Sequence, residues 1–215
     1  PDSMSVERRL LMTAYGAEVV LTPGAEGMKG AIAKAEELSK TMQNSFIPSQ
    51  FENPSNPMAH YITTAPEIWE ATEGKQDAVV ACIGTGGTIS GCARFFKEKN
   101  PSVHVVGVEP KDSPLLTEGK AGPHALQGIG ANFIPETLDP TVLNEILTVS
   151  REEAFATARE IARTEGILVG ISSGAALAAA IKIAQRDNFA DKNVVVVLPD
   201  TGEHYLSSDL FSDEK

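Results

Sequence analysis

The chain has 215 residues, of which 42% are hydrophobic and 22% charged, a balance that excludes a disordered or collagen-like protein and suffices for a buried core. Acidic residues outnumber basic ones by 29 to 18, and the net charge of −11 argues against nucleic acid or an anionic membrane as a partner. The longest apolar run, residues 194–198, has the length of a strand and is too short for a membrane span. We therefore expect a water-soluble globular protein.

Cysteine and histidine usage favours a reducing compartment and no metal site. The two cysteines, Cys82 and Cys92, and the four histidines are scattered without metal-ligand spacing, and no secretory leader follows Pro1. We expect a cytoplasmic protein in which both cysteines act as small buried hydrophobes. Structural or surface roles are expected for the histidines, which are His60, His104, His124 and His204.

Helix and strand patterns alternate along the chain. In chain order, the predicted elements are a helix over residues 6–15, a strand over 18–21, helices over 28–42 and 57–72, a strand over 78–83, a helix over 88–99, strands over 103–108 and 145–149, a helix over 151–166, a strand over 167–170, a helix over 175–185 and a strand over 194–198. A capping-box pattern, Ser150 followed by Glu153, predicts the start of the helix at residue 151.

The predicted strands are continuously apolar, which indicates burial on both faces. This favours an α/β protein with a mostly parallel sheet and helices on both sides. Prolines at positions 54 and 57 exclude regular structure there, so we place a domain boundary nearby, with domains over residues 1–55 and 56–215. Residues 110–140 are irregular and rich in Gly and Pro, and irregular segments of this length are more often functional than idle.

The sharpest motif is Gly84-Thr85-Gly86-Gly87-Thr88, which lies between a predicted strand and a predicted helix. Glycines let backbone amides approach an anion closely, and a helix N-terminus adds partial positive charge and unpaired N–H donors. The two threonine hydroxyls are further donors. The motif therefore predicts a phosphate-binding turn.

Other interpretations of this turn remain open. A dinucleotide fingerprint needs Gly or Ala where Ile89 stands, and no P-loop lysine follows the glycines. Glu109, at the end of the next strand, stands where a ribose-binding acid would be, so a dinucleotide is a minor alternative. The remaining alternative is a tight turn without a ligand.

A second turn, at residues 170–175, also joins a strand to a helix and contains Ser172 and Ser173. Taken alone, it is explained by helix capping, because serine is a preferred N-cap residue. In a parallel sheet, however, the carboxyl ends of all strands lie on one edge, so the two turns can face one ligand. Asn53 and Asn56 precede or follow prolines, and we expect them to form turns more than to touch substrate.

Several segments together resemble the cysteine synthase family, also called O-acetylserine sulfhydrylase, over the whole chain. They are residues 2–9, 50–57, 84–88, 127–135 and 170–175, with the Gly-Glu-His-Tyr-Leu-Ser sequence at 202–207. The resemblance implies a fold of the tryptophan-synthase-β type and pyridoxal 5′-phosphate as cofactor. The turn at 84–88 would hold the cofactor phosphate through its amides and the hydroxyls of Thr85 and Thr88. Ser172 would hydrogen-bond the pyridine nitrogen.

The same resemblance implies the reaction. The acetate of O-acetyl-L-serine would be replaced by sulfide to give L-cysteine, with Gln50 near the substrate carboxylate and Gly128 in the loop at the active-site entrance. The family's cofactor-bearing lysine lies in an Asn-Pro-x-x-Ser-x-Lys-x-Arg context that no lysine here has. We therefore assign no catalytic residue, interpret the chain as a C-terminal fragment lacking the N-terminal third, and expect it to be inactive alone.

The resemblance leaves two alternatives and implies further partners. One alternative is an enzyme of the cystathionine β-synthase type, which uses a larger thiol. The other is a non-catalytic binding partner of serine acetyltransferase, whose C-terminal tail would enter the site. A homodimer is also expected.

Overall fold

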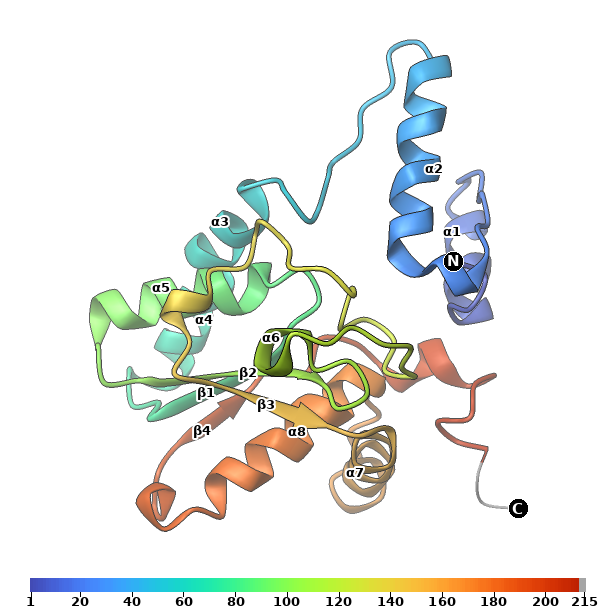
Figure 1. The fold of residues 1–215 in the computed structure, drawn as a ribbon. Coiled ribbons are helices and arrows are strands. Elements are labelled where there is room, and N and C mark those ends of the chain that lie inside the picture. Colours follow the sequence, from blue (N-terminus) through green and yellow to red (C-terminus); the bar gives the residue numbers. More distant parts are fainter. Residues whose placement is uncertain (213–215) are drawn as a thin grey trace.

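The computed structural model describes residues 1–212 and shows helices packed on both sides of a central sheet (Figure 1). The longer elements are α1 (Val6–Ala14), α2 (Gly27–Thr41), α3 (Ser55–Ile62), α4 (Thr64–Ala71), β1 (Ala78–Cys82), α5 (Gly87–Lys99), β2 (His104–Pro110), α6 (Leu115–Glu118), β3 (Glu145–Val149), α7 (Arg151–Thr164), α8 (Ile171–Ala184) and β4 (Val194–Val196). Short 3₁₀ turns are η1 (Gly24–Glu26), η2 (Pro140–Val142), η3 (Asp187–Phe189) and η4 (Gly202–Tyr205).

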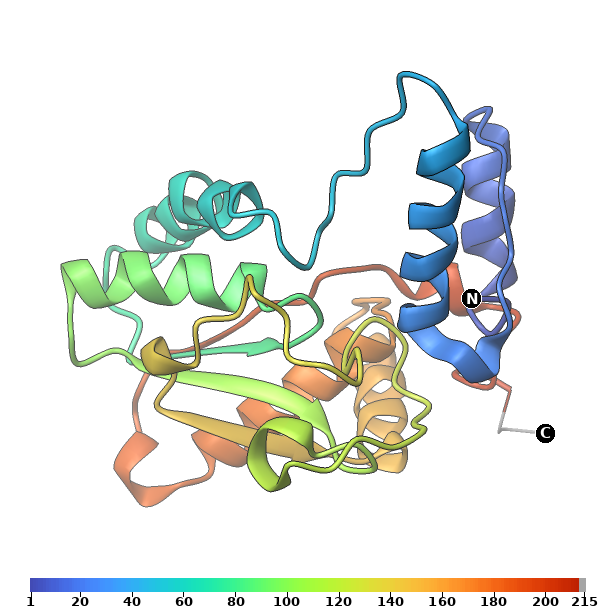
Figure 2. The same ribbon diagram turned by 45° about the horizontal axis from the view of Figure 1, so that its top comes forward.

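The four-stranded sheet has the order β3-β2-β1-β4, and every pairing is parallel. Val80 on β1 pairs with Val106 on β2 and with Val196 on β4. Helix α5 covers one face with α3 and α4 outside it, and α7 and α8 cover the other, as the two ribbon views show (Figure 2). The expected parallel α/β architecture is confirmed.

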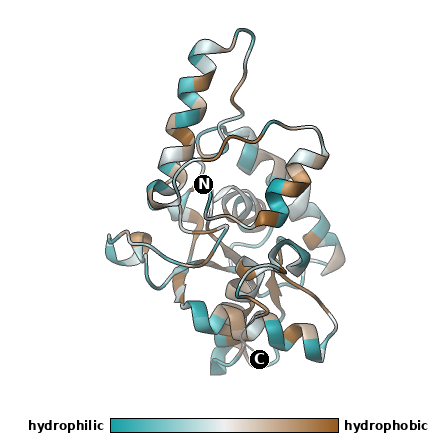
Figure 3. Cartoon of the chain, turned by 90° about the vertical axis from the view of Figure 1, so that its right-hand side faces the viewer, coloured by the Kyte–Doolittle hydropathy of each residue, from teal (hydrophilic) through white to brown (hydrophobic). Residues whose placement is uncertain are grey.

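Each face of the sheet has its own core. Val79 and Ala81 on β1 point toward the core that contains Phe96 of α5, whereas Val80 lies in the core that contains Ile183 of α8. Strand residues alternate between faces, so a strand buried on both faces must be apolar at every position. Figure 3 shows this as brown strands at the centre and mixed colours on the outer helices.

Helices α7 and α8 approach each other closely because α8 carries small residues. A Cβ on Gly174 would lie 2.2 Å from the Ala154 carbonyl oxygen, so glycine is needed at this crossing. The predicted capping box begins α7: the Glu153 amide donates to Ser150 Oγ over 3.2 Å, and Glu153 Oε2 accepts from the Ser150 amide over 2.8 Å.

Several predicted elements differ in the structure. The helix predicted over 175–185 begins at Ile171. The prolines at 54 and 57 do not exclude regular structure there, because α3 begins at Ser55 and proline is tolerated in the first turn of a helix. Residues 18–21 are extended but form no strand, because a strand requires a hydrogen-bonded neighbour and the described residues supply none. Residues 167–170 form only one antiparallel bridge, between Val169 and Thr201. The helix predicted over 57–72 breaks at Thr63 (φ −123°, ψ −72°), since Pro66 lacks an N–H for the Ile62 carbonyl and its ring would clash there.

Helices α1 and α2 lie to one side of the sheet and are joined to α3 by a long extended connection (Figure 1). The division into domains 1–55 and 56–215 stays a prediction, and its last three residues lie outside the described ones. Within residues 1–212, no helix has both the length and the apolar character needed to cross a membrane. Over the same residues, no cluster of three or more His, Cys, Asp and Glu side chains could hold a metal ion.

Candidate functional site

The glycine-threonine turn (residues 84–88) lies at the carboxyl edge of the sheet, between β1 and α5. Gly86 has a φ of +80°, a left-handed conformation that other residues adopt at a cost, and it caps the N-terminus of α5. A Cβ on Gly84 would lie 2.5 Å from the Gly128 carbonyl oxygen. Glycine at position 84 therefore lets the turn meet the 127–130 loop backbone to backbone.

Asn56 connects the turn to the loop that carries Gln50. Its Nδ2 donates to the Gln50 carbonyl over 2.7 Å and to Thr85 Oγ1 over 3.0 Å, and Thr85 Oγ1 also accepts from the Gly87 amide over 3.1 Å. A Cβ on Gly87 would lie 1.9 Å from Asn56 Oδ1. Asn53 forms the expected turn, since its Oδ1 accepts from the Ser55 amide over 2.9 Å.

Thr137 holds the turn from the other side, and the sequence analysis did not find it. Its buried Oγ1 donates to the Thr85 carbonyl over 2.7 Å, and its amide donates to the Phe51 carbonyl over 3.2 Å. Thr137 lies in the irregular segment 110–140, where no periodicity separates a threonine that binds backbone from one that faces solvent. Only the length of that segment signalled a function.

The Thr88 hydroxyl is paired with His60. Thr88 Oγ1 lies 3.1 Å from His60 Nε2, and His60 Nδ1 lies 2.9 Å from Thr64 Oγ1. Burial lowers the pKa of His60 below its ordinary value of 6.5. A neutral imidazole donates through one nitrogen and accepts through the other, so this chain of bonds orients the Thr88 hydroxyl. His60 therefore has the structural role that the sequence favoured, next to the turn.

We expect His60 to make folding sensitive to mild acid. Because its pKa is lower in the folded state than in the unfolded state, the unfolded chain takes up a proton first as the pH falls below 6.5. Stability is therefore complete above 6.5 and is lost as the pH falls through the lowered pKa. Urea unfolding at about pH 7.5 and about pH 5.5 should show a smaller loss for His60→Gln than for the unchanged protein. Equal losses in the two proteins would contradict the assignment.

Ser172 lies in the first turn of α8 and adjoins Gly128. A Cβ on Gly128 would be 3.7 Å from Ser172 Oγ, and the Ser172 hydroxyl has no hydrogen-bond partner among the described residues. Its carbonyl accepts from the Cys82 thiol over 3.2 Å, and burial raises the pKa of that thiol. Burial also raises the pKa of Cys92 to about 12, so both cysteines stay as thiols, in keeping with the hydrophobic role expected of them.

These segments border a cleft of about 870 Å³. Gln50, Gly84, Thr85 and Gly128 line it, whereas Gly86 and Gly87 are buried behind the turn. Gln50 is exposed, and its side chain is hydrogen-bonded to none of the described residues. Thr88 and Ser172 do not line the cleft, because the Thr88 hydroxyl is paired with His60 and Ser172 is buried next to Gly128. The predicted residues thus lie along one edge of the sheet, with Gln50, Gly84, Thr85 and Gly128 on the cleft wall and the others behind it.

The donors at this edge fit a ligand with an anionic group. The amides of Thr88 and Ile89 lie in the first turn of α5, where helical geometry provides no acceptor, and the N-terminal dipole favours negative charge. Ser172 offers a second, separate donor or acceptor, because its hydroxyl is unpartnered among residues 1–212. A phosphate at the turn and a polar ring atom at Ser172 match this pair of groups.

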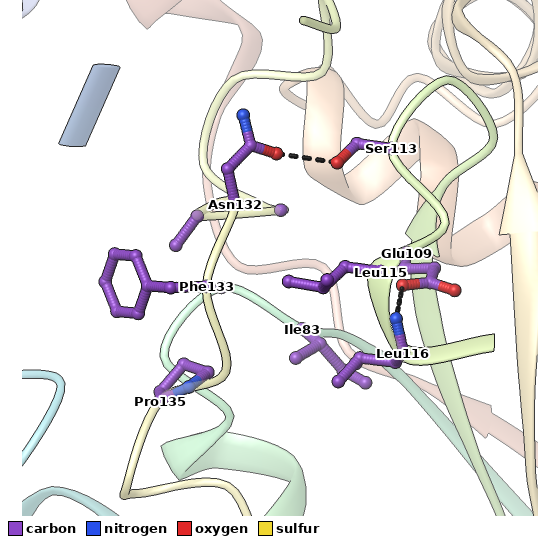
Figure 4. A pocket seen from close by; sticks show the side chains of 11 residues that line it. Ile83, Glu109, Ser113, Leu115, Leu116, Asn132, Phe133 and Pro135 are labelled. Atoms are coloured by element: carbon purple, nitrogen blue, oxygen red, sulfur yellow. Dashed lines mark hydrogen bonds between the residues drawn. The ribbon is translucent and has the colours of Figure 1, made fainter. Parts of the chain in front are cut away.

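The dinucleotide alternative fails at Glu109. This buried carboxylate accepts from the Leu116 amide over 2.8 Å and from the amide and hydroxyl of Thr117 over 3.0 and 2.5 Å. Both oxygens of Glu109 are therefore engaged by the first turn of α6. Figure 4 shows Glu109 bonded to Leu116 beside a small cavity of about 20 Å³ behind the turn, where Ser113 Oγ lies 2.6 Å from Asn132 Oδ1.

Comparison with known proteins places the chain in a family. Residues 1–200 match the family described as pyridoxal-phosphate dependent enzyme. The chain is 50% identical to the cysteine synthase of Buchnera aphidicola subsp. Acyrthosiphon pisum, over 99% of this chain and 70% of that protein.

Two solved structures have the same fold. O-Acetyl serine sulfhydrylase isoform 3 from Entamoeba histolytica has a TM-score of 0.91 at 44% identity, over 100% of this chain and 64% of that one. The O-acetylserine dependent cystathionine beta-synthase from Helicobacter pylori has a TM-score of 0.91 at 43% identity, over 96% of this chain and 67% of that one. The expected fold class is confirmed, and the chain spans roughly two thirds of these proteins.

Proposed function

Because this chain belongs to the cysteine synthase family of pyridoxal-phosphate-dependent enzymes, we propose that its complete gene product makes L-cysteine from O-acetyl-L-serine and sulfide. The observation that carries the proposal is the meeting of the glycine-threonine turn with Gly128 and the unpartnered Ser172 hydroxyl at one sheet edge. The turn offers N–H donors for an anion, and Ser172 offers a neutral hydroxyl. A pyridine ring that carries a phosphate needs both kinds of group.

The amides of the turn and the hydroxyls of Thr85 and Thr88 would hold the cofactor phosphate, and Ser172 would bind the pyridine nitrogen. When bound, pyridoxal phosphate supplies an electron sink that lets acetate leave the β-carbon and sulfide take its place. A neutral serine does not keep the ring nitrogen protonated, so the ring withdraws electrons less strongly than a protonated ring would. The loss of acetate requires only this moderate withdrawal. Asn56 and Thr137 hold the turn in place, so they would preserve the geometry of the phosphate donors.

Gln50 and Gly128 would serve the substrate. Gln50 lies exposed on the cleft wall with a free amide, and its backbone is fixed to the turn through Asn56 over 2.7 Å. An amide at this place suits a substrate carboxylate, which accepts hydrogen bonds. Gly128, whose φ of +90° suits glycine, carries the loop at the cleft opening.

The test compares the complete gene product with the 215-residue chain, both supplied with pyridoxal phosphate, O-acetyl-L-serine and sulfide. We expect the complete protein to form L-cysteine and the chain alone to form none, because no lysine here has the family's sequence context. Robust turnover by the chain alone would refute the second expectation. Absence of turnover by the complete protein, with bound cofactor demonstrated by absorbance, would refute the proposed reaction.

The same assay addresses the alternatives. Homocysteine in place of sulfide tests the cystathionine β-synthase type, and a faster reaction with homocysteine would favour it. Titration with the C-terminal peptide of serine acetyltransferase tests a partner role, and unchanged cofactor fluorescence at saturating peptide would count against that role. We also propose a homodimer, which sedimentation of the complete protein would check, and a cytoplasmic location, which fractionation of cells would check.

A further inference from the structure

Three polar side chains come together beside α8, and only Tyr205 among them is fully buried: Arg8 on α1, Asp200 after β4 and Tyr205 on η4. Asp200 Oδ2 accepts from the Tyr205 hydroxyl over 2.7 Å and from Arg8 Nη2 over 2.8 Å, and Arg8 Nη2 also donates to the Tyr205 oxygen over 2.9 Å. The Arg8 guanidinium lies 5.4 Å from the centre of the Tyr205 ring. We call this the Arg8–Asp200–Tyr205 network.

Asp200 fixes the N-terminus of α8 on both sides of Ser172. Its carbonyl accepts from the Gly170 amide over 3.1 Å and from Ser173 Oγ over 3.3 Å, and its Oδ1 lies 3.4 Å from the same hydroxyl. A Cβ on Gly170 would be 2.2 Å from Asp200 Oδ1, so the carboxylate lies directly against this turn. A carboxylate there also faces the positive end of the α8 dipole.

Burial keeps the Tyr205 hydroxyl protonated. Burial first, and then the hydrogen bond to Asp200, raises the pKa of Tyr205 to about 12, so its hydroxyl keeps its proton and donates to the carboxylate. Tyr205 is 1% exposed and the Asp200 side chain 14%, whereas the Arg8 side chain is 38% exposed. The Arg8–Asp200 ion pair is therefore only partly shielded from solvent, and its geometry is held by the hydrogen bonds from Arg8 and Tyr205 to the same carboxylate oxygen.

The other end of the network reaches the loop beside Ser172. Arg8 lies on the segment whose Ser5 amide donates to Gln127 Oε1 over 3.2 Å, and Gln127 precedes Gly128. Glu7, next to Arg8, accepts from the Ser207 amide over 2.6 Å and from its hydroxyl over 2.8 Å. The start of the chain is thus tied both to the α8 turn and to the loop that adjoins Ser172.

We propose that the Arg8–Asp200–Tyr205 network positions Ser172 for the cofactor ring, with Asp200 as the positioning residue. The inference rests on the proposed function and adds to it the group that holds the ring contact. Ser172 makes no side-chain bond of its own among the described residues, so its direction follows from the backbone on either side. Asp200 holds the Gly170 amide through its carbonyl and the Ser173 hydroxyl through its carbonyl and Oδ1, and Arg8 and Tyr205 hold the Asp200 side chain.

The test is a double-mutant cycle on pyridoxal phosphate binding by the complete gene product, from which cofactor has first been removed. Asp200→Asn removes the charge with little change in size, and Ser172→Ala removes the ring contact. We expect Asp200→Asn to weaken cofactor binding about tenfold when Ser172 is present and less than about twofold in the Ser172→Ala background, because coupled residues are not additive. The fluorescence of bound cofactor should change in the same direction in both single variants.

Glu145→Gln is the matched control, because Glu145 accepts from Arg186 over 2.6 and 2.9 Å and from His104 in a similar cluster at the opposite end of the sheet. It should leave cofactor affinity and fluorescence unchanged. The proposal would be overturned if Asp200→Asn weakened cofactor binding equally with Ser172 and with Ala at position 172. It would also be overturned if Glu145→Gln weakened cofactor binding as much as Asp200→Asn does.

A poorly folded Asp200→Asn protein would not end the test. Tyr205→Phe removes one hydroxyl and keeps the buried ring. The same double-mutant cycle with Ser172→Ala can then be measured with this variant. We expect non-additive effects on cofactor affinity, and additive effects would contradict the proposal. A wild-type protein that bound cofactor and made no cysteine would refute only the proposed reaction. A wild-type protein that bound no cofactor would overturn both inferences.

Discussion

Replacing Gly84 with alanine is expected to weaken pyridoxal phosphate binding by about 10- to 100-fold, since overpacking that shifts backbone costs about 1–3 kcal/mol. The added Cβ would lie 2.5 Å from the Gly128 carbonyl oxygen. Ordinary contact requires these atoms to separate by about 1 Å. The neighbour is backbone, so no side-chain rotation relieves the overlap, and the turn and the Gly128 loop must part. Titration of the cofactor-free complete protein with pyridoxal phosphate measures the loss.

Gly119→Ala is the control for this substitution. Gly119 has a φ of +71°, and a Cβ there would meet nothing within 4 Å. Alanine at 119 should cost about 1 kcal/mol of stability from its left-handed conformation and leave cofactor affinity unchanged. If both variants bound cofactor as the wild type does, the close approach of the turn to Gly128 would not matter for the site.

The largest loss of stability is expected from Phe96→Ala. Phe96 is fully buried in the core between α5 and the sheet, and truncation of such a phenylalanine costs about 3–5 kcal/mol through lost burial and the cavity left behind. That is a large part of the roughly 5–15 kcal/mol that stabilises a typical protein. Urea unfolding should show a lower midpoint with an unchanged slope.

Phe46→Ala is the matched control, because the Phe46 side chain is 82% exposed in the connection between α2 and α3. Its stability should stay within about 0.5 kcal/mol of the unchanged protein. Similar midpoints for the two variants would mean that the α5 core is not as the structure shows it.

Sequence patterns predicted an element correctly where the interaction that forms it joins residues close together in the sequence. The capping box at Ser150 needs only residues three apart, and the bounds of β3 and of α2 follow from their own apolar patterns to within a residue. The continuous apolar strands indicated burial on both faces, which the alternation of Val79 and Val80 between two cores confirms.

Prediction failed where a partner distant in sequence decides the outcome. Residues 18–21 have a strand-like pattern, but no described neighbour pairs with them. Glu109 stands where a ribose-binding acid would, yet its oxygens are taken by Leu116 and Thr117. Asn56 was expected to form a turn, but it lies in the first turn of helix α3, and its bond to Thr85 over 3.0 Å supports the site.

The amino-acid sequence by itself determined the parallel α/β class and the resemblance that named the family, and it predicted anion binding at residues 84–88. These depend on residue types at short spacing, and short spacing fixes local conformation. Only the tertiary structure decided that Thr137 holds Thr85, that His60 orients Thr88 and that Asp200 fixes the turn around Ser172. Each of these contacts joins residues more than 25 positions apart, whose approach depends on how the helices and the sheet pack.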